Sequence, residues 1–97
     1  MGTDKEDADA IINEQFAVNS YPNPTTGMLH IEIVNCKGNE GKISLYNPLG
    51  QLVLEKNISI EQGKAQEIFD LGHLAQGTYM LSFKSDEQQI IQKVVKE

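Results

Sequence analysis

Several residue types that often carry function are rare or missing in this chain. The 97 residues include no arginine and no tryptophan, and the only cysteine is Cys36. Eight lysines stand against 14 acidic residues, so the formal net charge is −6. Nucleic acids and anionic membrane surfaces are bound through clustered Lys and Arg, so this balance argues against both as partners.

The lone cysteine excludes an intrachain disulfide. In the segment NCKGNE, Cys36 is typical of a turn residue rather than of a nucleophile. If its thiol were exposed, two copies could be joined by a disulfide, so a homodimer stays open at this point.

Catalytic and metal-binding patterns are also missing. His30 and His73 do not have the spacing of a metal site, and His30 is expected on the outward, solvated face of its strand. There is no G-x-S-x-G elbow, phosphate-binding loop or C-x-x-C pair, and the acidic residues of 4–9 form a solvated tail. We therefore expect no enzyme, no cofactor and no metal. No apolar run approaches the ~20 residues that span a bilayer, and the amino end does not resemble a signal peptide.

The composition divides the chain into two regions. Residues 1–15 begin with the acidic stretch MGTDKEDADA, which is typical of a linker or an expression leader. Residues 16–97 are long enough to form a single core without disulfides or a metal. The segment IINEQFAV, residues 11–18, suits a first strand or a short helical lead-in equally.

From Tyr21 onward, alternating apolar residues and regular turn signals predict short strands. MLHIEIV (28–34) places Leu29, Ile31 and Ile33 on one face. The turn NPLG (47–50) joins two alternating segments, so residues 42–58 predict a β-hairpin. Further strands are expected over 65–71, 78–85 and 89–97. This spacing predicts an all-β fold, an antiparallel β-sandwich of about seven short strands.

The stretch YPNPTTG precedes the first clear strand. Tyr21 and Asn23 both come before prolines, which predicts extended backbone there, and Gly27 is expected to adopt a positive φ. A rigid segment of this kind could simply direct the chain into the core, or it could be bound directly by a partner. The sequence leaves both interpretations open.

Four motifs in series resemble a known family, the C-terminal sorting domains of type IX secretion system cargo (the Por secretion system sorting domain family). The resemblance covers residues 18–97 in the family's order and spacing. The matching positions are Pro22, Asn23, Pro24 and Gly27; Tyr46, Asn47, Gly50 and Val53; Leu74, Gly77 and Tyr79; and the tail Lys93, Val94, Val95 and Lys96.

The resemblance implies an immunoglobulin-like β-sandwich with a non-catalytic sorting role. Family members end larger precursors of Bacteroidota, which cross the inner membrane and periplasm before an outer-membrane translocon carries them to the cell surface or medium. A sortase-like cysteine protease then removes the domain, and the cargo is commonly joined to anionic lipopolysaccharide. The implied partners are thus the translocon, the protease and an upstream cargo domain. The cut is expected within residues 7–16, since a protease needs an exposed flexible segment.

Roles within the motifs can also be assigned. Gly50 and Gly77 are expected to be structural, and the rings of Tyr46 and Tyr79 are expected in the core. The tail is the preferred recognition element, with the charges of Lys93 and Lys96 reaching solvent and the last strand presenting an edge for a partner. Lysines that merely protect this edge from aggregation are the alternative. Family tails use arginine as well as lysine, whereas this one has lysine only and ends in Glu97.

A second function class stays open, that of an accessory binding module attached to a secreted hydrolase. Such a module would be fibronectin-like or carbohydrate-binding. A carbohydrate-binding module would show an exposed aromatic platform. With three tyrosines, three phenylalanines and no tryptophan, most of them expected in the core, the sequence gives little support for one.

Overall fold

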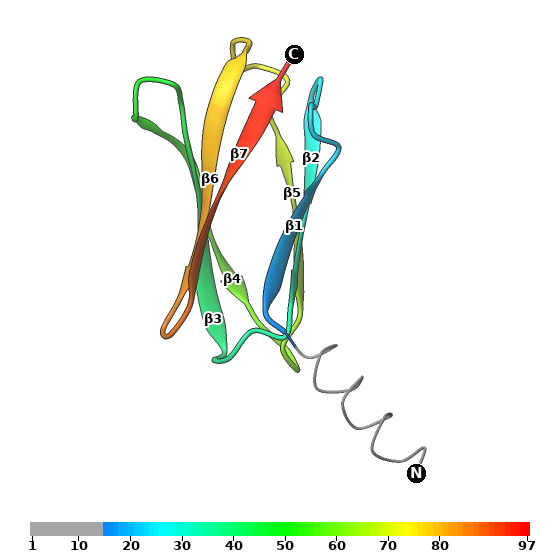
Figure 1. Cartoon of the computed structure of the whole chain (residues 1–97), viewed down its shortest axis with the longest axis vertical. Coiled ribbons are helices and arrows are strands. Elements are labelled where there is room, and N and C mark those ends of the chain that lie inside the picture. Colours follow the sequence, from blue (N-terminus) through cyan, green and yellow to red (C-terminus); the bar gives the residue numbers. More distant parts are fainter. Residues whose placement is uncertain (1–14) are drawn as a thin grey trace.

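The computed structural model describes residues 15–97. Three strands form one sheet in the order β1-β2-β5, and four form a second in the order β4-β3-β6-β7, with antiparallel pairing throughout. The two sheets face each other in Figure 1. The strands are β1 (Ala17–Tyr21), β2 (Met28–Val34), β3 (Glu40–Tyr46), β4 (Leu52–Ser59), β5 (Ala65–Asp70), β6 (Gly77–Ser85) and β7 (Gln89–Lys96).

This topology confirms the predicted sandwich. The chain passes from one sheet to the other between β2 and β3, between β4 and β5 and between β5 and β6, as in immunoglobulin-like domains. Within residues 15–97, no helix is long and apolar enough to cross a membrane. The division at residue 15 stays a prediction, and residues 1–14 lie outside the described part.

Alternation along the strands sets the core as predicted. Successive side chains of a strand point to opposite faces, so every second residue enters the space between the sheets. The side chains of Leu29, Ile31 and Ile33 are at most 1% exposed. The other strand residues of the core are Val18, Ile43, Leu45, Ile58, Phe69, Tyr79, Leu81, Phe83 and Val94.

The two motif tyrosines differ in their placement. Tyr79 is buried at the start of β6, and its hydroxyl donates a hydrogen bond to the carbonyl of Ala75 at 2.7 Å. This contact is a tyrosine corner, which ties the β5–β6 loop to the core. The prediction for Tyr46 is wrong: it pairs with Met80 of β6, and that position lies on the outer face of the sheet. Tyr46 directly follows Leu45, which points inward, so the strand period places its ring outside.

The β3–β4 hairpin is confirmed, and Asn47 organises its turn. The carbonyl of Asn47 accepts from the amide of Gly50 at 2.8 Å, and its side-chain oxygen accepts from the amides of Leu49 and Gln51, each at 2.9 Å. Gly50 has φ of 83°, a conformation that favours glycine, as expected for its structural role.

Two expectations for the Pro-Asn-Pro loop, residues 22–27, are wrong. The expected extended backbone is present at Tyr21, which ends β1, but residues 22–24 form bends, and the peptide bonds preceding Pro22 and Pro24 are cis. Gly27 is not among the residues with positive φ. Its carbonyl accepts from the amide of Leu71 at 2.9 Å, so its position is fixed by the β5–β6 loop instead.

Cys36 is buried, with 6% of its surface exposed. Its thiol donates to the carbonyl of Lys37 at 3.3 Å, and its amide donates to the carbonyl of Gly63. The condition for a disulfide-linked dimer, an exposed thiol, is therefore not met.

We predict that replacing Tyr79 by Phe lowers the free energy of unfolding by about 1–2 kcal/mol, because the carbonyl of Ala75 loses its donor. Urea denaturation measures the change. Tyr46→Phe is the matched control: its partly exposed ring lies outside the core, and the expected loss is within about 0.5 kcal/mol. Equal losses in both variants would contradict the assigned role of the Tyr79 hydroxyl.

Candidate recognition surface

The family-like motifs meet at one end of the sandwich, which we call the motif end. Figure 1 shows the β1–β2 loop, the β3–β4 turn, the β5–β6 loop and the carboxyl terminus together at this end. β1 begins at the opposite end. Segments more than 70 residues apart in the sequence therefore form one surface.

Thr25 joins the Pro-Asn-Pro loop to the last strand. Its amide donates to the carbonyl of Val95, and its carbonyl accepts from the amide of Glu97, both at 2.8 Å. This is a parallel bridge opposite Lys96. The hydroxyl of Thr25 donates to the carbonyl of Met28 at 2.8 Å and accepts from the amide of Gly27 at 3.1 Å. Thr25 is 1% exposed, so these bonds form away from solvent.

Asn23 continues this pairing through its side chain. The side-chain amide nitrogen donates to the carbonyl of Lys93, and the side-chain oxygen accepts from the amide of Val95, both at 2.9 Å. One asparagine side chain thus replaces a neighbouring strand over this part of β7. The expected free edge is therefore absent at the tail, since Asn23 and Thr25 already occupy it. A partner strand could extend the sheet here only by displacing the Pro-Asn-Pro loop.

The four tail residues divide between the two faces of β7. Val94 is fully buried in the core, and Lys96 is 7% exposed, whereas Lys93 and Val95 are exposed. The Lys96 ammonium donates to the carbonyl of Leu74 at 3.2 Å and to the main-chain oxygen of Glu97 at 3.0 Å. The expectation that the Lys96 charge reaches solvent is wrong. Lys96 lies two residues after Val94 and therefore shares its inward face.

Two further motifs meet at Gly77, which begins β6. A side-chain carbon built on Gly77 would lie 3.0 Å from Cγ of Pro48, in the β3–β4 turn. Gly77 also has φ of 157°. The close approach of Pro48 explains why glycine stands here, in agreement with its predicted structural role.

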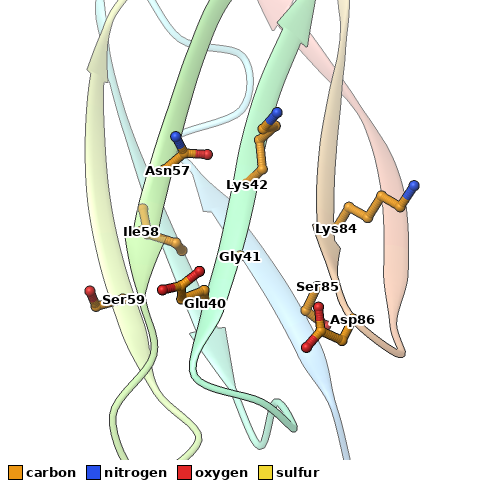
Figure 2. A pocket seen from close by; sticks show the side chains of 9 residues that line it. All are labelled: Glu40, Gly41, Lys42, Asn57, Ile58, Ser59, Lys84, Ser85 and Asp86. Carbon is orange, nitrogen blue, oxygen red and sulfur yellow. The ribbon is translucent and has the colours of Figure 1, made fainter.

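Two other hollows on the surface of residues 15–97 lack convergent catalytic side chains. One hollow, of about 670 Å³, is open and lies at the far end of the four-stranded sheet. In Figure 2 the side chains of Glu40 and Lys42 come from β3, that of Lys84 from β6 and that of Asp86 from the turn after β6, and they do not converge on one point. A second, of about 320 Å³, is lined by Tyr21, His30 and Ile68 on the other sheet. His30 is half-buried rather than fully solvated, because its ring stacks on Tyr21. Among the described residues, no His, Cys, Asp and Glu side chains group as metal ligands would.

These contacts define an immunoglobulin-like sandwich in which the Pro-Asn-Pro loop is hydrogen-bonded to the last strand, β7. Residues 19–97 match the family described as secretion system C-terminal sorting domain. The chain belongs to this family, the type IX sorting domains. No protein with a curated description matches it.

A similar fold occurs in the crystal structure of dimeric latent PorU from Porphyromonas gingivalis, with a TM-score of 0.64 and 19% sequence identity. The match covers 81% of this chain and 9% of that chain, so the present chain corresponds to a small part of the larger protein. At this identity the likeness concerns the fold.

Thr25 is the residue of this surface that sequence reasoning missed. We predict that Thr25→Val lowers the free energy of unfolding by about 1–3 kcal/mol, since the part-buried amide of Gly27 and carbonyl of Met28 lose the Thr25 hydroxyl as a partner. Amide hydrogen exchange at Val95 is expected to accelerate more than exchange in β3. Thr26→Val, at an exposed position beside it, is the control and should change stability by less than about 0.5 kcal/mol. An unchanged Thr25→Val variant would show that the hydroxyl does not hold the loop.

Proposed function

We propose that this chain is the sorting signal of a larger exported protein and that the type IX translocon recognises the motif end. The observation that carries the proposal is the convergence of all four family motifs at this end, where Thr25 fixes the tail in place. A folded signal needs rigid surface features, because a partner then pays little entropy to order them. Family membership over residues 19–97 supports the same role and supports delivery to the cell surface or medium.

Membership of the family suggests the steps of export, cleavage and attachment that we propose for the precursor. The precursor crosses the inner membrane and periplasm, a sortase-like cysteine protease cuts before the domain, and the cargo is joined to anionic lipopolysaccharide. The arrangement of the strands supports a cut within residues 7–16. β1 begins at Ala17, at the end opposite the motif end, and the ring of Phe16 packs against Phe83, so a cut on the amino side of Phe16 would leave the sandwich whole.

Within the tail, we assign direct contact with the translocon to Lys93 and Val95, whose side chains point outward. Val94 and Lys96 act through the fold, by filling the core and by holding the β5–β6 loop. A truncation after Gln92 would therefore disturb folding and recognition together. Point variants separate the two.

We predict that the full chain, fused behind a signal peptide and a fluorescent protein, brings fluorescence to the surface or medium of a type IX-competent bacterium but not of a translocon-deficient strain. Lys93→Glu should reduce this export several-fold with an unchanged unfolding midpoint, because the exposed charge is reversed while the core is kept. Lys84→Glu, an exposed lysine of β6 far from the motif end, is the matched control. Retention of the unaltered fusion in the periplasm of both strains would contradict the sorting role.

One observation favours the second candidate, a carbohydrate-binding accessory module. The rings of Tyr21 and His30 stack with centroids 5.4 Å apart and planes 7° from parallel, beside the hollow of about 320 Å³. The ring of Tyr21 is 49% exposed, and an exposed aromatic ring offers an apolar surface to the face of a sugar. If the domain has this function, soluble oligosaccharides should shift the NMR signals of Tyr21 and His30, and Tyr21→Ala should abolish the shifts. Unchanged spectra at millimolar sugar would exclude this candidate.

A further inference from the structure

A row of outward side chains crosses the four-stranded sheet from edge to edge. Leu52 of β4 lies opposite Tyr46 of β3, Tyr46 lies opposite Met80 of β6, and Met80 lies opposite Lys93 of β7. Leu52 is 50% exposed and Met80 is 37% exposed. The β3–β4 register shifts between Leu45 and Tyr46, and Leu52 is the residue that lies opposite Tyr46 after the shift. Directly opposed residues of neighbouring strands share one face, so three apolar side chains and one lysine lie in one line. We call these four residues the apolar row.

Leu49 extends the row at the tip of the β3–β4 turn, between Tyr46 and Leu52 in the chain. It is 83% exposed, the highest value among the large exposed hydrophobic residues of the described chain. The bonds that Asn47 accepts from the amides of Leu49 and Gln51 hold the backbone of this turn. An exposed leucine on a fixed turn gives a partner apolar contact area at little ordering cost.

Lys93 places a positive charge at one end of the apolar row. Among the described residues, the ion pairs are Lys42 with Glu55 and Lys56 with Glu67, so Lys93 has no carboxylate partner although the chain is acidic. The other lysine of the tail, Lys96, is turned inward. A single unpaired cation at the end of an apolar line is complementary to an apolar groove with a carboxylate at one end.

We propose that Leu49 and the apolar row are the surface through which a protein of the outer-membrane translocon binds this domain. The partner presents an apolar groove that receives Leu49, Leu52 and Met80, with a carboxylate opposite Lys93. Continuity with the motif end supports this assignment, since the row includes Tyr46 and Lys93 from two of the four motifs. The inference rests on the sorting function proposed above and names the surface that carries it.

The experiment compares exposed apolar residues of the two sheets in the export assay, with the full chain as the sorting signal. Leu52 and Ile68 are each 50% exposed, the first in the row and the second on the outer face of the three-stranded sheet. Leu49→Glu and Leu52→Glu are expected to lower export by about tenfold, the effect of losing one central apolar contact. Ile68→Glu is expected to stay within about twofold of the unaltered chain, since it introduces the same charge at the same exposure.

Urea denaturation of each purified variant identifies folding defects, and sedimentation gives its oligomeric state. Normal export of folded Leu49→Glu and Leu52→Glu would overturn the inference while the sorting function stands. So would equal losses of export in all three variants. Failure of the unaltered fusion to be exported would overturn the sorting function and the inference with it. If Leu52→Glu converts a dimer to a monomer while export is unchanged, the row is an interface between copies of this chain, which also overturns the inference.

Discussion

The backbone pairing between Thr25 and β7 is the contact on which the motif end depends. The pairing satisfies the carbonyl of Val95 and the amide of Glu97 at the edge of the four-stranded sheet, where no further strand follows. It also fixes the loop that precedes β2, since the Thr25 hydroxyl bonds to Gly27 and Met28. Because buried main-chain groups need partners, loss of this residue would expose both the loop and the tail.

An ion pair links the two sheets on the opposite side of the sandwich. Lys56 of β4 and Glu67 of β5 form an ion pair across the free edges of the two sheets. Charged residues at an edge discourage pairing with another chain. On the other side, Gln92 of β7 donates to the carbonyl of Val18 in β1, and Ser20 donates to Gln92. At the β7 edge, Asn23 and Thr25 already pair with the main chain, so extension of the sheet there would require their displacement.

Local pattern was sufficient to predict most of the fold. The alternation of Leu29, Ile31 and Ile33 marks an inward face because a half-buried strand has period two. The same rule could have placed Lys96 correctly, since it follows Val94 by two residues, but its charge suggested exposure instead. The burial of Lys96 becomes intelligible only with the carbonyl of Leu74 beside it. Sequence separation hides such a contact, and no local pattern predicts it.

The same limit applies to the candidate recognition surface. The motif residues were found by their resemblance to a family, yet the resemblance does not say which of them support the others. The structure separates them: Thr25, absent from the family pattern quoted, makes four of the bonds at the motif end. The apolar row could not be foreseen either, because the register among four strands decides that Leu52 and Lys93 lie in one line.

The period of a strand gives the short tail two roles at once. Val94 and Lys96 face inward and hold the sandwich together, while Lys93, which belongs to the apolar row, and Val95 face outward. If the inward residues fail to pack, the outward residues lose their fixed positions. Under the proposed function, binding of the outward residues would therefore depend on the folding of the domain. Because binding and folding would depend on the same strand, a translocon that contacts the outward side chains would bind the folded domain and not the unfolded one. It would need no further contact to discriminate between them.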